Sequence, residues 1–169
     1  KIYKAELIET HGGSIRVYIS KNRKIIKDKS ISKIFLYEKK LSINKEKTYD
    51  DFEKNIFLIK KNFIKNIQFL KKKYKKIIGY EAPAKATTAL NYFGVKNDLI
   101  DSIIDDNTLK INRYIPGTGI KIISSKSVTK KQKCILVLAW NMFDEIKIKN
   151  QKLCSNFINI KDLYDKDFI

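Results

Sequence analysis

The stretch KIIGYEAPAKATTALNYFG, residues 76–94, decides the fold class of this chain. It predicts a strand over residues 76–79 and a helix over residues 83–93. Pro83 stands near the first helical turn and Gly94 just past the last one, where each residue type is favoured. A strand that passes within a few residues into a helix is the first half of a βα unit, and such units build parallel sheets.

The same alternation of strand and helix continues toward the C-terminus. Short apolar segments predict strands at residues 102–105, 119–123, 133–139 and 156–160, and a helix is expected over residues 141–149. Parallel strands joined by crossovers form layered α/β domains. The predicted fold is therefore α/β, a Rossmann-like three-layer domain with a mostly parallel sheet.

The N-terminal part has a different pattern. Residues 3–9 and 14–19 predict a β-hairpin-like start, and residues 30–41 predict a short helix. A long helix follows, for which Thr48 and Asp51 have the spacing of a capping box. Its apolar stripe, from Tyr49 to Tyr74, recurs at steps of three and four residues and is interpreted as packing surface. No internal linker is evident, so residues 1–169 are predicted to form a single domain.

The composition limits the possible classes of partner. The formal net charge is +18, but the excess is lysine, and Arg16, Arg23 and Arg113 are the only arginines. Proteins that recognise phosphates and bases rely mainly on arginine, so a specific nucleic-acid partner is not expected. A nucleic-acid-binding domain is the alternative that the net charge supports. No apolar run is long enough to span a membrane, so no membrane partner is expected.

The two cysteines bear on metal binding and on the cellular compartment. Cys134 and Cys154 lack the spacing of metal ligands, and no metal site is predicted. They are interpreted as reduced core residues of a cytoplasmic protein.

The turn between the first strand and helix of the βα unit is the first candidate site. Backbone N–H groups at the helix start, together with Lys85, could hold a phosphate. The dinucleotide fingerprint is nevertheless absent, since Glu81 and Ala86 stand where glycine would let the backbone approach a pyrophosphate. Asp105 lies roughly where a ribose-binding acid would be. An ordinary structural turn is the alternative.

His11 is the only histidine, and it is followed by Gly12, Gly13 and Ser14. An imidazole is the best general base that the chain offers near neutral pH. A solitary histidine can equally be structural, and the sequence alone leaves both interpretations open.

Two further segments carry candidate binding groups. The loop at residues 113–119 combines Arg113 with the Thr118 hydroxyl and could grip a phosphate or a sugar hydroxyl. Trp140 and Asn141 close the apolar strand at its carboxyl end, which faces the ligand crevice in open α/β sheets. Asn141 could equally serve only as the N-cap of the next helix.

Taken together, these segments resemble the C-terminal domain of the S-adenosylmethionine-dependent sugar C-methyltransferase family. The family carries five short motifs, and they recur in order over nearly the whole chain. Here they read as His-Gly-Gly-Ser at 11–14, Gly-Tyr-Glu-Ala-Pro-Ala-Lys-Ala at 79–86, Asn-Tyr at 91–92, Arg-Tyr-Ile-Pro-Gly-Thr at 113–118, and Leu-Ala-Trp-Asn at 138–141 followed by Asp-Glu-Ile at 144–146. The sequence departs from the family pattern at Glu81, Ala86 and Gly119, where the family has Gly, Gly and commonly His.

The resemblance implies that the chain is a fragment of a longer protein with an upstream zinc domain and an upstream domain that binds S-adenosylmethionine. The fragment itself is expected to bind no cofactor and, in isolation, to methylate nothing. Its implied partners are that upstream methyl-donor domain and a nucleotide-sugar-like small molecule.

The resemblance also implies roles for particular residues. His11 would take the proton next to the keto group of a nucleotide-linked sugar. Lys85, Arg113 and the helix start at Pro83 are expected to anchor the diphosphate. The remaining expected substrate contacts are Gly12, Gly13, Ser14, Tyr80, Glu81, Thr118 and Asn141. A Rossmann-like module that binds a nucleotide or a protein without catalysis is the alternative function.

Overall fold

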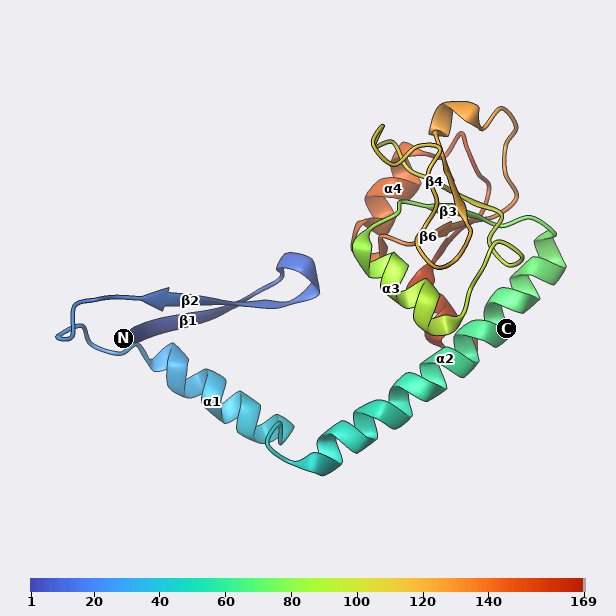
Figure 1. The fold of residues 1–169 in the computed structure, drawn as a ribbon. Helices are drawn as coiled ribbons and strands as arrows, with labels where there is room; N and C mark the ends of the chain where they lie inside the picture. The colour runs from blue at the N-terminus through green and yellow to red at the C-terminus, as the bar shows by residue number, and fades with distance from the viewer. Residues whose placement is uncertain (169) are drawn as a thin grey trace. The chain divides into compact units, whose positions relative to one another are not determined.

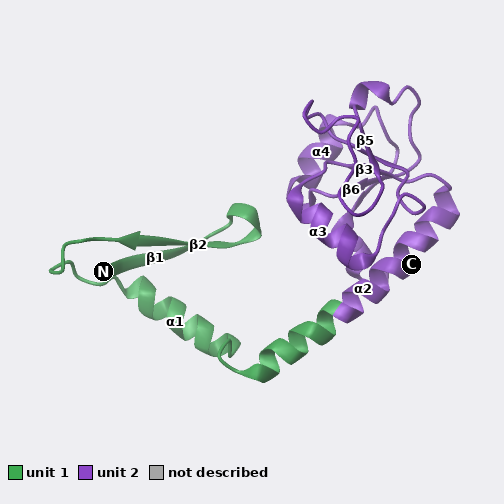
Figure 2. Cartoon of the chain, viewed as in Figure 1, with its two compact units in different colours: residues 1–56 green, residues 57–169 purple. Residues whose placement is uncertain are grey.

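The computed structural model describes residues 1–168. The chain forms two compact units, residues 1–56 and residues 57–169, which Figure 2 shows in different colours. The boundary lies within the continuous helix α2, Glu46–Tyr74. It therefore has no Pro- or Gly-rich linker by which the sequence could reveal it.

Unit 1 contains the predicted hairpin and the predicted short helix. Strands β1 (Ile2–Ile8) and β2 (Ser14–Ile19) pair in antiparallel fashion around the 3-10 turn η1 (Thr10–Gly12). Helix α1 (Lys29–Leu41) begins after Asp28, whose carboxylate accepts a hydrogen bond from the Ser30 N–H at 2.7 Å. Ala5 is the one hydrophobic residue of this unit that is buried among the described residues. Unit 1 therefore has almost no core of its own.

Helix α2 begins two residues before the predicted capping box, and that prediction is wrong. Thr48 lies inside the helix, and its hydroxyl donates to the Ser42 carbonyl at 2.8 Å instead of capping the helix. The apolar stripe divides into two parts. Near the start of the helix Phe52 is exposed, whereas Phe63 and Ile67 in the second half are fully buried.

Unit 2 is built around a five-stranded, all-parallel sheet with the strand order β5-β4-β3-β6-β7. The predicted α/β, Rossmann-like class is confirmed. Each strand is shorter than predicted, and buried apolar neighbours such as Ile77, Ile120 and Leu138 lie outside the strands. The strands are β3 (Ile78–Tyr80), β4 (Ser102–Ile104), β5 (Lys121–Ile123), β6 (Ile135–Val137) and β7 (Phe157–Asn159).

Helices cover both faces of this sheet (Figure 1). One face packs on the second half of α2 and on α3 (Ala84–Phe93), and Phe63 stacks on Phe93 with ring centroids 4.3 Å apart. The other face packs on α4 (Phe143–Lys149) through Ile146. The short 3-10 helices of this unit are η2 (Ser125–Ser127), η3 (Trp140–Met142) and η4 (Ile160–Tyr164).

The cysteines are free and buried in unit 2, as expected. Burial raises the pKa of the Cys134 thiol to about 12, so it carries essentially no thiolate at neutral pH. Across residues 1–168, no helix is both long enough and apolar enough to cross a membrane.

Candidate functional site

The strand order places a topological switch point between β3 and β6. From β3 the chain adds β4 and β5 on one side, then returns to add β6 and β7 on the other. The connections leave the carboxyl ends of β3 and β6 in opposite directions, which opens a crevice there in sheets of this type. The Leu138 N–H donates to the Tyr80 carbonyl at 3.0 Å, which holds the two strand ends together.

The turn that follows β3 is set by Glu81, which has a left-handed backbone with φ of 67°. Its N–H donates to the Ile104 carbonyl at 2.8 Å, so the turn is tied to the end of β4. Left-handed backbone favours glycine, which accounts for the glycine that the family pattern has here. Burial, followed by repulsion from Asp105, raises the pKa of the Glu81 carboxyl above its usual range.

Asp105 holds the same turn from the neighbouring strand end. Its side chain is 3% exposed and accepts hydrogen bonds from the Ala82 N–H at 2.9 Å and from the Lys110 ammonium at 2.8 Å. Lys110 also donates to the Ala82 carbonyl at 3.0 Å. Burial opposes ionisation, but the hydrogen bonds from Lys110, Asn107 and Ala82 outweigh it and lower the pKa of Asp105. Asp105 follows β4 directly, and both of its carboxylate oxygens are engaged by the protein.

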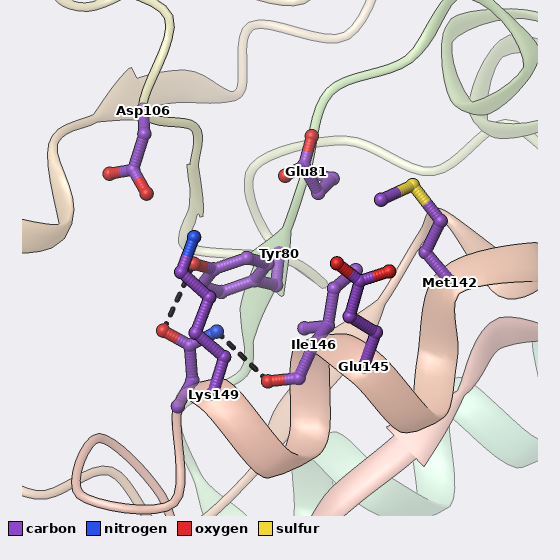
Figure 3. Close-up of a pocket in the computed structure, with 8 residues that line it drawn as sticks. Tyr80, Glu81, Asp106, Met142, Glu145, Ile146 and Lys149 are labelled. Atoms are coloured by element: carbon purple, nitrogen blue, oxygen red, sulfur yellow. Dashed lines mark hydrogen bonds between the residues drawn. The ribbon is translucent and has the colours of Figure 1, made fainter.

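A pocket opens beside this turn on the α4 side of the sheet (Figure 3). Tyr80 is 3% exposed, and its hydroxyl donates to the Asn150 side-chain oxygen at 3.1 Å. Figure 3 shows the carboxyl groups of Glu81, Asp106 and Glu145 around the Tyr80 ring. Met142, Ile146 and Lys149 complete the lining with Asn150. This carboxylate pocket is suited to hydroxyl or cationic groups more than to a phosphate.

A second hollow lies on the α3 side, at the ends of β6 and β7. It is lined by Lys85, Ala86, Ala89, Leu138, Trp140, Ile160 and Tyr164. The ammonium of Lys85 lies 5.2 Å from the Trp140 ring centroid, and that of Lys161 lies 3.7 Å from it. Lys85 and Trp140 lie in segments that the sequence marks as candidate binding sites, whereas Lys161 and Tyr164 do not. These residues follow a short strand in a stretch that matches no motif, so only the fold brings them to Trp140.

Polar side chains on α2 hold the wall of this Trp140 hollow. The Asn62 amide donates to the Tyr164 carbonyl at 3.0 Å, and the Asn66 amide donates to the Leu163 and Asp165 carbonyls at 3.0 and 2.7 Å. The backbone that carries the Tyr164 ring is therefore fixed to the long helix.

The start of α3 and the end of β6 lie at this edge, as predicted. Pro83 is the N-cap residue of α3, and Lys85 is exposed in its first turn. Asn141 is exposed within η3 and is not the N-cap of α4, because Met142 holds that position without a side-chain capping bond. The structure therefore brings together Tyr80, Glu81, Pro83, Lys85 and Asn141.

Arg113 and Thr118 are separated from that group. Arg113 pairs through its carbonyl with the Ile122 N–H at 2.8 Å, so it lies outside the edge strand β5, with β4 and β5 between it and β3. Thr118 is 3% exposed, and its hydroxyl donates to the Ile115 carbonyl at 3.1 Å within a turn that precedes β5. A turn before a strand lies at the amino edge of a parallel sheet, opposite the Pro83 end of α3. This geometry does not favour the expected grouping of Arg113 with Lys85, because two strands separate Arg113 from β3.

His11 lies in unit 1, in the turn η1, with φ of 58°. Its side chain is exposed. Gly12 and Gly13 continue the left-handed path, and the Ser14 hydroxyl donates to the Thr10 carbonyl at 2.9 Å. The predicted residues Gly12, Gly13 and Ser14 thus shape the turn that presents the imidazole.

Metal ligands do not gather in the part of the chain that the structure describes. Within residues 1–168, no group of three or more His, Cys, Asp or Glu side chains is placed to hold a metal ion.

Comparison with known proteins identifies the family. A family model described as the C-methyltransferase C-terminal domain matches residues 9–159, a span that includes the η1 turn, the β3–α3 turn and the end of β6. No curated protein matches the chain. The match covers most of the sequence and agrees with the all-parallel sheet of unit 2. The chain therefore belongs to the family of C-methyltransferase C-terminal domains.

Proposed function

We propose that this chain is the substrate-binding domain of an S-adenosylmethionine-dependent C-methyltransferase that acts on a nucleotide-linked keto sugar or a related small molecule, and that His11 is its general base. The observation that carries the proposal is the meeting of the β3–α3 turn and the end of β6 at the switch point of a chain in this family. Ligands of open α/β sheets bind at that position.

The chain's own residues do not fit the methyl donor at this crevice. Glu81 places a carboxyl group at the turn where a nucleotide-type cofactor needs a bare backbone, and the Asp105 carboxylate is engaged by Lys110 and Ala82. Donor binding is therefore assigned to an upstream domain of the full enzyme. The isolated chain is expected to methylate nothing.

The role of His11 follows from the chemistry of the substrate class. A neutral imidazole nitrogen takes the proton from the carbon next to the ketone, the C–H electron pair moves into the enolate, and the imidazole becomes positively charged. The left-handed turn holds this residue in an exposed position between β1 and β2. The imidazolium exchanges its N–H proton with solvent and then returns a solvent-derived proton to the enolate carbon, which restores both the ketone and the neutral imidazole.

Proton exchange tests this role without the methyl donor. The chain is incubated in deuterated water with uridine- and thymidine-diphosphate keto sugars, and deuterium at the carbon beside the ketone is followed by NMR. The proposal expects exchange above the rate without protein. The His11→Ala variant should reduce that exchange by about 100-fold or more, since general-base catalysis typically contributes that much.

Calorimetry separates this role from the alternative, a binding module without chemistry, which the strained Glu81 departure favours. Nucleotide-sugar binding that is equal in the wild type and in His11→Ala, with exchange lost only in the variant, supports the base. Binding without any exchange would leave the module as the function. Tight binding of S-adenosylmethionine to this chain would contradict the proposed division between domains.

A further inference from the structure

The two hollows at the carboxyl edge of unit 2 have opposite charge. The carboxylate pocket, on the α4 side, is lined by Glu81, Asp106 and Glu145 with Lys149 as its single cation. The Trp140 hollow, on the α3 side, is lined by Lys85, and among residues 1–168 no Asp or Glu side chain lines it. A ligand with an anionic end and a hydroxyl-rich end would therefore have a preferred orientation across the β3–β6 switch point.

A hydrogen bond from the end of β7 holds the backbone of Trp140 in place. The Asn159 amide at the end of β7 donates to the Trp140 carbonyl at 3.3 Å. The same Asn159 side chain accepts from the Lys161 N–H at 3.0 Å, which caps η4 and positions Lys161. The Lys161 ammonium then lies 3.7 Å from the Trp140 ring centroid. The Asn159 side chain thus links the backbones of Trp140 and Lys161.

The charge of Lys161 is not balanced by a neighbouring acid in the described part of the chain. Within residues 1–168, Lys161 forms no ion pair, although Asp162 follows it in sequence. The Asp162 carboxylate accepts instead from the Asn159 N–H at 3.1 Å. Lys85 lies on the same indole ring from α3. Two ammonium groups from separate elements therefore converge on one aromatic ring beside a hollow of about 190 Å³.

We propose that the Trp140 hollow, with Lys85 and Lys161, binds the nucleoside diphosphate part of the substrate; this inference rests on the proposed function. The diphosphate lies against the two ammonium groups, because ammonium groups form charge-assisted hydrogen bonds with phosphate oxygens. The carboxylate pocket repels the phosphates and receives the sugar, whose hydroxyl groups can donate to carboxylates. Lys161 replaces Arg113 as the second diphosphate anchor.

The test uses the fact that Trp140 is the only tryptophan of the chain. Its fluorescence reports on this hollow alone, whereas calorimetry reports on binding anywhere. The full chain is titrated with thymidine diphosphate, uridine diphosphate and inorganic pyrophosphate. We expect both nucleotides to change the fluorescence with the dissociation constant that calorimetry gives.

Charge-removing variants locate the diphosphate. Lys85→Ala and Lys161→Ala should each weaken nucleotide binding about five- to tenfold, and rising salt should weaken the wild type more than either variant. Lys166→Ala, an exposed lysine of the same C-terminal segment, is the matched control and should change binding less than about twofold.

The outcomes separate the two proposals. Calorimetric binding that leaves Trp140 fluorescence unchanged, and that is equal in Lys161→Ala and the wild type, overturns this assignment while the proposed function stands. Absence of binding to every nucleotide and nucleotide sugar overturns both proposals.

Discussion

Glu81 is the residue at which the chain departs most clearly from a backbone requirement. A non-glycine residue with φ of 67° is disfavoured by contact between its Cβ and the carbonyl oxygen, by about 1 kcal/mol. The carboxyl group is also half-buried and faces like charge from Asp105. Both effects reduce the stability of the folded state.

Two substitutions separate the backbone effect from the charge effect. Glu81→Gly should raise the free energy of unfolding by about 1 kcal/mol, because glycine adopts the left-handed conformation without the Cβ contact. Glu81→Gln keeps the strained backbone and removes only the charge. Urea denaturation of both variants at several pH values measures the difference.

The contribution of Glu81 to the free energy of unfolding depends on pH, and the sign of this dependence follows from its pKa. The folded pKa of Glu81 is raised above its ordinary value of 4.5, so the folded state binds the proton more tightly than the unfolded state. Stability from this group is present below 4.5 and is lost as the pH rises through the folded pKa. The gain of Glu81→Gln over wild type should therefore be near zero at acidic pH and positive at neutral pH. An equal gain at both would rule out the charge effect.

At the scale of elements, two of the five family motifs are structural partners. The Asn91 amide, near the end of α3, donates to the Pro116 carbonyl at 2.9 Å and to the Thr87 carbonyl at 2.8 Å. Gly117 has φ of 77°, and a Cβ there would collide with the Asn91 side-chain oxygen. The Asn-Tyr and Pro-Gly-Thr motifs thus hold a loop against a helix end, which explains their presence without a ligand.

A double-mutant cycle tests this pairing. Gly117→Ala should lower the free energy of unfolding by about 2 kcal/mol, from left-handed strain and from the collision with Asn91. In an Asn91→Ala background the collision is absent, so the same change should cost only about 1 kcal/mol. Chemical denaturation gives the coupling energy. Additive effects would show that the loop and helix end are independent.

At the scale of the whole molecule, the two units differ in how much core they bury. Unit 2 has apolar clusters on both faces of its sheet, whereas among the described residues of unit 1 only Ala5 is a buried hydrophobic residue. Exposed apolar side chains of unit 1 include Leu7, Ile19 and Phe35. Local stability follows buried apolar contacts, so the two units should not open with the same free energy.

Native-state hydrogen exchange of the full chain measures that difference. Amides of β3, β4 and β6 should exchange only through global unfolding. Amides of β1 and β2 should exchange through openings at least about 2 kcal/mol lower in free energy, because few buried contacts are lost when the hairpin opens. Equal protection in both sets of strands would contradict the division into units of unequal stability.

Sequence motifs predict one part of the candidate site and miss another. The motifs pointed to the β3–α3 turn, to Lys85 and to the end of β6, because such signals are local and follow each strand directly. The motifs do not distinguish Thr118 from the residues at the carboxyl edge of the sheet. Its hydroxyl donates to the Ile115 carbonyl within the turn before β5. The motifs also miss Lys161, which no sequence spacing connects to Trp140.

What the sequence by itself determined is the alternation of strands and helices, the parallel class of the sheet and the family, because each depends on patterns within a few consecutive residues. The start of α2 differs from the prediction, because Thr48 has the spacing of a cap but lies inside the helix, where its hydroxyl donates to the Ser42 carbonyl. Only the tertiary structure decided the strand order, the occupation of Asp105 by Lys110, and the convergence of Lys85 and Lys161 on Trp140. Those features join residues far apart in the chain, and their energies exist only once the sheet has brought them together.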